Sequence, residues 1–201
     1  MKRETIEYAI HLFSDHGGVL RTKKAMDLGI HPRTLYYMRD KSLVERISRG
    51  VYRLASLPPL SQPDLATVAL RIPRAVICLV SALSYHDITT QIPHEVQIAL
   101  PRGTKKPVLE HPPIHVFRFS GNPLTEGITT VPIDAVNVRI YKPAKTVADC
   151  FRFRNKIGTD VAIEALKLCL EDKHIKSAEL LRYARLWHVE KIMLPYLEAL
   201  Q

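Results

Sequence analysis

Residues 22–54 read TKKAMDLGIHPRTLYYMRDKSLVERISRGVYRL, and this stretch decides the fold of the N-terminal part of the chain. Apolar side chains at helical spacing predict two short helices in it, over residues 22–28 and 32–41. Gly29 lies between them, where a turn needs a positive φ angle, and Pro32 suits the first turn of a helix. Two strand-like runs follow, at 43–47 and 50–54, and the link between them is typical of a tight hairpin.

A further helix precedes this stretch, because Ile6, Ala9, Ile10 and Phe13 recur at helical spacing within residues 2–14. Three helices followed by a β-hairpin are the element order of a winged helix-turn-helix. The sequence therefore predicts that fold for residues 1–56.

The third helix of this unit has two distinct faces. At 100° per residue, Leu35 and Met38 lie within about 60° of each other and define the buried side. The opposite side carries cations, a hydroxyl and aromatic rings, which suit phosphates and base edges in a major groove. The predicted DNA-binding set adds a helix-two hydroxyl and the cations of the hairpin: Thr22, Arg33, Thr34, Tyr36, Tyr37, Arg39, Lys41, Arg46, Arg49 and Arg53.

The charge of the chain favours the same interpretation. The chain has 29 Lys and Arg against 20 Asp and Glu, a formal net charge of +9. Residues 21–53 carry nine of the cations and only three of the anions, whereas residues 57–201 are nearly balanced. A solvated basic face or a protein-binding winged helix are the alternatives, but element order and local charge together favour double-stranded DNA. One short helix specifies a short site, so a homodimer on a repeated DNA sequence fits this interpretation.

Three prolines within residues 55–63 predict a linker at 57–63, because proline lacks an amide donor and favours extended geometry before it. Beyond it, residues 64–201 contain several strand-like runs that are followed by helical patterns. Val76–Leu79 fits either a strand or a buried helix. The predicted fold class is α+β, with a winged helix-turn-helix and a second α+β domain that has a small, mainly antiparallel sheet and terminal helices.

Signals for catalysis and for metal binding are weak. The chain lacks a Gly-x-Gly-x-x-Gly turn, a phosphate-binding Gly-Lys-Ser/Thr loop, a Gly-x-Ser-x-Gly elbow and a Cys-x-x-Cys pair. The prediction is a protein that is not an enzyme, with no catalytic residue, no metal and no cofactor. Cys78, Cys150 and Cys169 are expected to be buried free thiols. Without a long apolar run or a signal-peptide core, the chain is expected to be cytoplasmic and not membrane-bound.

Several short motifs resemble the AbiEi family, the antitoxins of type IV (AbiE abortive-infection) toxin–antitoxin systems. They occur in the family's order along most of the chain: Gly29-Ile30-His31-x-x-x-Leu35, Leu43-Val44-x-x-Ile47-x-Arg49-Gly50-Val51-Tyr52, Ser81-Ala82-Leu83-x-x-His86-x-Ile88-Thr89, Val96 to Gly103, and Ile140-Tyr141-x-x-x-Lys145-Thr146-Val147-Ala148-Asp149. Lys145 stands where a member of the family would carry Arg, so a contact that needs a planar fork is not expected. Ser81, His86, Thr146 and Asp149 are motif residues with either a structural or a partner-facing role.

The resemblance implies a bacterial protein with two parts. The first would bind inverted repeats upstream of its own operon and repress it. The second would oppose a co-encoded toxin with a nucleotidyltransferase fold, and a stable complex is not required for that. The predicted function is thus a transcriptional autorepressor and antitoxin. The alternatives are a winged-helix transcription factor whose second domain senses a ligand or dimerises, and a nuclease, which would need a tighter acidic cluster than Asp134, Asp149 and Asp160.

Overall fold

The computed structural model describes residues 3–134, 136–171 and 175–200. Contacts divide the chain into two compact units. The first unit extends to Arg71 and includes Pro132–Asn137, and the second comprises Ile72–Val131 and the chain from Val138 onward. The predicted boundaries at 57–63 follow the proline-rich segment instead, and they stay a prediction.

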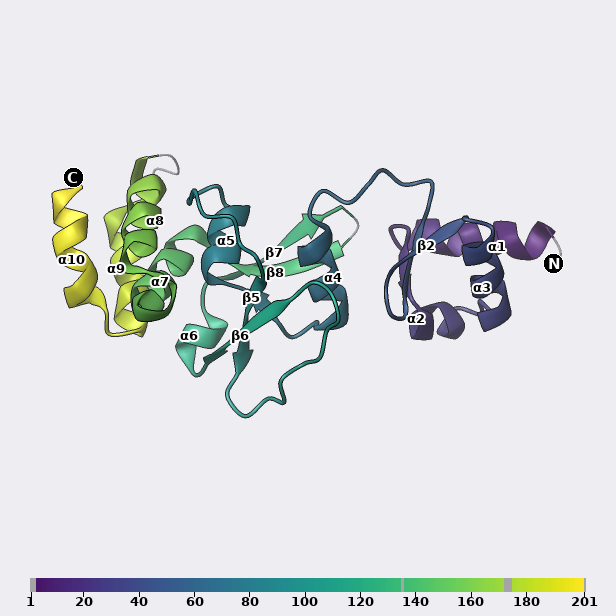
Figure 1. Ribbon diagram of the computed structural model, residues 1–201, viewed down its shortest axis with the longest axis horizontal. Coiled ribbons are helices and arrows are strands. Elements are labelled where there is room, and N and C mark those ends of the chain that lie inside the picture. The colour runs from purple at the N-terminus through teal and green to yellow at the C-terminus, as the bar shows by residue number, and fades with distance from the viewer. Residues whose placement is uncertain (1–2, 135, 172–174, 201) are drawn as a thin grey trace. The chain divides into compact units, whose positions relative to one another are not determined.

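The first unit begins with a helical part and a small sheet (Figure 1). Its helices are α1 (Arg3–Asp15), α2 (Thr22–Asp27), α3 (Pro32–Asp40) and α4 (Pro63–Arg71), and its strands are β1 (Val19–Arg21), β2 (Val44–Ser48) and β3 (Val51–Leu54). The three strands form an antiparallel sheet in the order β1-β3-β2. Strand β3 is therefore central, with Arg53 opposite Val19 on one side and Glu45 on the other.

One apolar core joins α1, α2, α3 and this sheet. Phe13 of α1 and Met38 of α3 are fully buried in it, and Leu35 is 1% exposed. Leu20, Val44 and Tyr52 add side chains from each of the three strands. The helices thus pack on the sheet through the apolar positions that the helical spacing predicted. Met26 of α2 is an exception, because its side chain is half exposed rather than inward.

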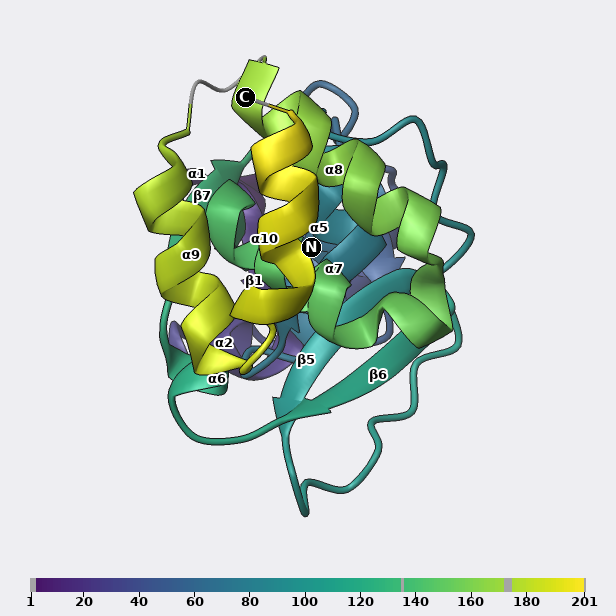
Figure 2. The ribbon, with the colours of Figure 1, turned by 90° about the vertical axis from the view of Figure 1, so that its left-hand side faces the viewer.

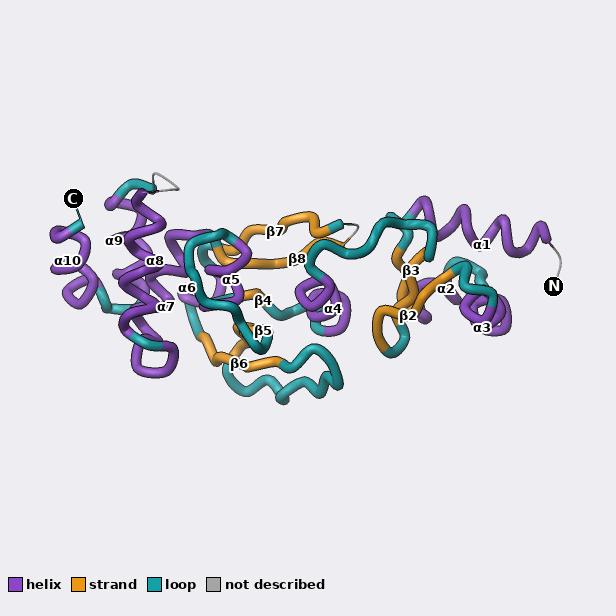
Figure 3. Tube along the Cα trace, turned by 45° about the horizontal axis from the view of Figure 1, so that its top comes forward, coloured by secondary structure: helices purple, strands orange, loops and turns teal. Residues whose placement is uncertain are grey.

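The second unit is built on a mixed five-stranded sheet in the order β6-β5-β4-β8-β7 (Figures 1 and 3). Its strands are β4 (Val76–Ile77), β5 (Val96–Pro101), β6 (Ile114–Phe119), β7 (Ile128–Ile133) and β8 (Val136–Tyr141). The end of β7 and the start of β8 are grouped with the first unit by their contacts. Strands β4 and β5 are antiparallel, whereas β5 pairs with β6 and β4 with β8 in parallel. The short helix α6 (Asn122–Thr125) lies between β6 and β7.

Five longer helices complete this unit: α5 (Leu79–Tyr85), α7 (Pro143–Ile157), α8 (Thr159–Glu171), α9 (Ser177–Leu186) and α10 (Glu190–Ala199). Helix α7 is the centre of the group and contacts α5, α8, α9 and α10. Figure 2 shows α7–α10 as one cluster at this end of the chain. The core of the unit takes its side chains from α5, α7, α8, α9 and α10 and from the sheet.

The predicted α+β fold class with an N-terminal winged helix-turn-helix is confirmed. Strand β1 and helix α6 were not expected from the sequence. The ambiguous run Val76–Leu79 contains the two-residue strand β4, and helix α5 begins at Leu79. The three cysteines are buried free thiols, as expected. None of the helices in the described part of the chain has the length and apolar composition needed to cross a bilayer.

A glycine fixes the entry to β7. Gly127 has φ +73°, and a Cβ added there would lie 2.8 Å from both Cβ and Cγ of Lys145 on α7. We predict that Gly127→Ala lowers the free energy of unfolding by about 2–4 kcal/mol, since it combines an unfavourable φ with overpacking. Chemical denaturation of the full chain measures this. Gly103→Ala is the matched control, because Gly103 has φ +80° with nothing within 4 Å of its added Cβ. Equal losses in the two variants would contradict the predicted clash.

Candidate nucleic-acid interface

Helix α3 is held in one orientation by its first residues and by its buried side. The His31 side chain accepts a hydrogen bond from the Arg33 backbone amide at 3.1 Å, and Pro32 occupies the first turn. Leu35 and Met38 are buried in the core of the first unit. Because these contacts fix the rotation of the helix, they also determine which side chains face solvent.

The outward side of α3 is basic and aromatic. Arg33, Arg39 and Lys41 are exposed, and Tyr36 is 47% exposed, whereas Tyr37 is partly buried. The Arg39 guanidinium pairs with Asp40 at 2.7 Å and lies 5.4 Å from the centre of the Tyr36 ring. Asp40 raises the pKa of Arg39, so the guanidinium stays positively charged. The Lys41 ammonium lies 5.9 Å from the centre of the Tyr37 ring. This side can therefore offer charged donors and a flat aromatic surface to a groove.

The hairpin β2–β3 adds two further exposed cations. The Arg46 guanidinium donates to the Ser48 carbonyl at 3.3 Å, and Arg49 lies at the turn. Among the described residues, neither these two nor Arg33 nor Lys41 forms an ion pair with a carboxylate. Their charges are thus available to phosphate groups.

Three of the predicted DNA-binding residues are not on the exposed basic surface. Thr34 is 5% exposed on the inner side of α3. Arg53 is 4% exposed and donates to the Glu45 carboxylate and to the Pro58 carbonyl. Arg53 lies between Val19 and Glu45 of the neighbouring strands, and the segment after β3 brings the Pro58 carbonyl to its guanidinium. Thr22 is partly buried, and its backbone amide donates to the Gly50 carbonyl at 2.9 Å.

The structure also exposes cations that the helix-face argument did not include. Arg21 at the end of β1 and Lys23 and Lys24 on α2 are all exposed. They belong to the basic stretch 21–53, so the local charge excess was the signal that could have identified them. The six-residue helix α2 was too short for its faces to be assigned by periodicity.

The four motif residues Ser81, His86, Thr146 and Asp149 form hydrogen bonds inside the second unit. The Ser81 hydroxyl donates to the Glu95 carbonyl at 3.2 Å and accepts from the Gln97 amide at 2.9 Å. The His86 Nε2 atom lies 2.7 Å from the Tyr141 carbonyl, to which it can donate a hydrogen bond. These bonds tie α5 to β5 and to the end of β8. The placement favours the structural alternative for both residues.

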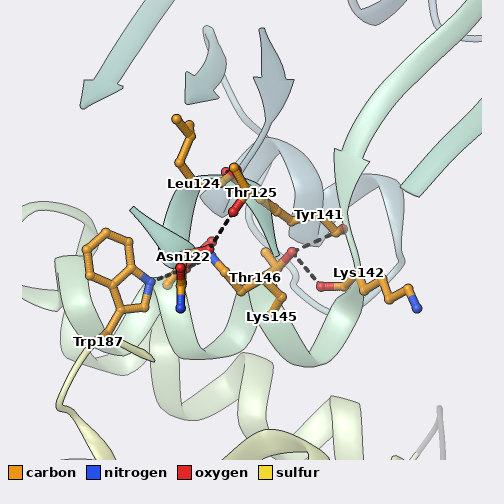
Figure 4. A network of polar contacts seen from close by, with 9 residues as sticks. Asn122, Leu124, Thr125, Tyr141, Lys142, Lys145, Thr146 and Trp187 are labelled. Carbon is orange, nitrogen blue, oxygen red and sulfur yellow. Dashed lines mark hydrogen bonds and ion pairs between the residues drawn. The ribbon is translucent and has the colours of Figure 1, made fainter. Parts of the chain in front are cut away.

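Helix α7 begins at the edge of the sheet with a buried polar network (Figure 4). The Thr146 hydroxyl lies 3.0 Å from the Lys142 carbonyl and 3.3 Å from the Tyr141 carbonyl, and it can donate to either. One turn later, Asp149 accepts hydrogen bonds from the Lys145 ammonium and from the Trp187 indole. Thr146, Lys145 and Asp149 are all fully buried, so none of them offers a surface to a partner.

Aromatic rings surround the Lys145 ammonium. Its Nζ atom lies 4.2 Å from the centre of the Tyr141 ring, 5.2 Å from that of Phe119 and 5.5 Å from that of Trp187. Such cation–π contacts replace part of the lost hydration. The ammonium also needs its counter-charge, because a buried cation without an anion is costly.

Burial raises the pKa of the Asp149 carboxyl from 3.8 to about 6, against the opposing effect of Lys145. Its Oδ2 atom has no hydrogen-bond partner among the described residues. The folded state therefore binds this proton more tightly than the unfolded chain does. It follows that the contribution of Asp149 to stability falls as the pH rises from about 4 to about 6.

Replacing one member of the Lys145–Asp149 pair should leave the other buried without its counter-charge. We predict that Lys145→Met lowers the free energy of unfolding by about 3–5 kcal/mol, because it leaves a buried carboxylate unpaired. Lys145→Met combined with Asp149→Asn should recover most of that loss while keeping an acceptor for Trp187. Urea unfolding of the two single variants and the double variant measures the coupling, and strictly additive losses would show that the pair does not interact.

Comparisons with known proteins agree with this architecture. No curated protein sequence matches the chain significantly. A crystal structure of the RV2827C protein from Mycobacterium tuberculosis is similar, with a TM-score of 0.57 and 12% sequence identity over 89% of this chain and 70% of that one. At this identity the likeness shows a shared fold. Residues 7–55, which contain most of α1 and all of α2, α3 and the three-stranded sheet, match the family described as "Transcriptional regulator, AbiEi antitoxin".

Proposed function

We propose that this protein is a transcriptional autorepressor and antitoxin of an AbiE-like system, and that the first unit binds double-stranded DNA. The observation that carries the proposal is the outward side of α3, where the exposed cations Arg33 and Arg39 and the exposed Tyr36 ring lie on a helix whose rotation is fixed. The family match over residues 7–55 supports a regulator and antitoxin role. The DNA is proposed to be the protein's own promoter.

In this arrangement α3 is the recognition helix. Arg33, near its first turn, is placed to read a base edge, since guanidinium groups pair with guanine in the major groove. Arg39 and Lys41, at its other end, would contact phosphates. Arg46 and Arg49 on the hairpin would contact the backbone beside the groove. Inverted repeats would be bound by two copies, because one α3 reads only a few base pairs.

The second unit is proposed to oppose a toxin with a nucleotidyltransferase fold. The buried positions of Thr146 and Asp149 imply that these motif residues support α7 rather than touch such a partner. Antitoxicity would therefore depend on residues other than these two, with or without a stable complex.

DNA binding is tested by separating base contacts from phosphate contacts. Arg49→Ala should weaken binding to promoter and random duplexes alike and reduce the slope of log K against log salt by about one. Arg33→Ala should instead relax discrimination at one or two base pairs, by roughly 1–3 kcal/mol each. Fluorescence anisotropy at several KCl concentrations measures both effects.

Two control variants sharpen this test. Arg53→Gln should lower stability yet leave the salt slope unchanged, because its guanidinium already serves Glu45 and Pro58. Lys191→Ala removes an exposed cation on α10 and should change neither quantity. If Arg33→Ala and Arg49→Ala lose the same affinity on every sequence, Arg33 contacts the backbone and not a base.

The antitoxin role is tested by co-expression of the full chain with the nucleotidyltransferase-like protein encoded beside it. The chain with both Arg33→Ala and Arg49→Ala should fail to repress a promoter reporter but still restore growth, since these residues belong to the first unit. Growth that is restored by neither this variant nor the unchanged protein would refute the antitoxin role.

A further inference from the structure

The second unit contains a basic hollow that the proposed function does not use. Its volume is about 390 Å³, and it lies between the end of β5, strand β6 and the last turns of α7. Four cations line it, namely Arg102, Arg118, Arg152 and Lys156, together with Phe117 and Phe153. No carboxylate is among its lining residues. The elements that form it can be followed in Figure 2.

Two of the four cations lie over aromatic rings, and Arg102, Arg152 and Lys156 are exposed to solvent. The Arg152 guanidinium lies 5.8 Å from the centre of the Trp187 ring and 5.9 Å from that of Phe153. The Lys156 ammonium lies 5.9 Å from the centre of the Phe117 ring. Phe117 and Phe153 themselves meet edge to face at 5.2 Å. These contacts orient the charges without neutralising them.

No ion pair balances the four charges within the described residues. One further contact, from the Arg118 Nη1 atom to the Pro101 carbonyl at 3.1 Å, fixes the direction of a guanidinium. Like charges that converge in a hollow raise the local potential and attract anions. The hollow is thus complementary to a group with several negative charges.

The backbone of α7 departs from helical angles beside the hollow. Phe153 has non-helical angles (φ −103°, ψ 15°) inside the helix. The interruption falls between Arg152 and Lys156, so it helps to determine how the two cations are presented. Residues in this sparsely allowed region of φ and ψ are frequent at binding sites.

We propose that this hollow binds a nucleotide through its phosphate groups, either as a free nucleoside triphosphate or as the 5′-triphosphate end of an RNA. The volume lies within the range of small-molecule sites. The cations suit a polyphosphate, and the partly exposed Phe153 adds apolar surface beside them. An adjoining hollow of about 270 Å³ shares Arg118 and Val116, and it adds Lys106 and the Glu95–His115 pair, so there is room beyond the phosphates for a polar group.

Titration of the full-length protein with a fluorescent nucleoside triphosphate tests this inference. Saturable binding is expected, and Arg152→Gln with Lys156→Gln should weaken it at least about tenfold, because two charge-assisted contacts are lost. Lys167→Gln with Lys191→Gln is the matched control, since it removes the same charge from exposed positions on α8 and α10 and should leave binding unchanged. Arg102→Gln provides an independent variant on another element. Circular dichroism and thermal unfolding check that each variant is folded.

Two further arms identify the source of the phosphate. A trinucleotide RNA with a 5′-triphosphate should compete with the fluorescent probe if an RNA end is the ligand, and only free nucleoside triphosphates should compete otherwise. Either result supports the site. The proposal is overturned if neither probe binds saturably at about 1 mM, or if the control pair weakens binding as much as the hollow pair. It is also overturned if promoter duplex displaces the probe and loses affinity in the same variants, because the hollow would then belong to the DNA surface.

Discussion

The burial of Leu35 and Met38 is the constraint on which the proposed DNA-binding surface depends. Both side chains are essentially inaccessible to solvent, and they lie on one side of the nine-residue helix α3. A helix of this length cannot rotate about its axis without exposing one of them, at a cost of a few kcal/mol. The outward positions of Arg33, Tyr36 and Arg39 are consequences of that packing. Sequence changes in the core would thus alter which side chains of α3 face solvent without replacing any of them.

The face of α3 could be predicted from the sequence because helical periodicity is a local property. The environment of Arg53 could not, because it depends on β1, a strand of three residues with no periodic signal. Strand β1 places Val19 on one side of Arg53, opposite Glu45 on the other, and the segment after β3 adds the Pro58 carbonyl as a partner.

In the second unit, too, contacts between neighbours in the sequence could be predicted, whereas contacts between distant segments could not. The spacing of Lys145 and Asp149, four residues apart, is visible in the sequence as a helical pair. Its burial is not, because the indole that completes the network comes from Trp187, 38 residues after Asp149. The parallel pairing of β5 with β6 likewise joins segments separated by a long loop, and it places Leu100 opposite Arg118. The basic hollow depends on that register, so it could not be predicted from any single stretch of sequence.

The net charge of +9 therefore has two physically different sources. The cations of α3 and of the hairpin are exposed, so salt screens them strongly, and they suit the long, evenly charged surface of a duplex. Those of the hollow line one small concavity, where Arg102, Arg152 and Lys156 are exposed and Arg118 is partly buried. Salt screens both sets, but four like charges around one concavity favour a compact anion over a long duplex. A basic composition alone cannot distinguish these two arrangements, whereas the packing around each cation can.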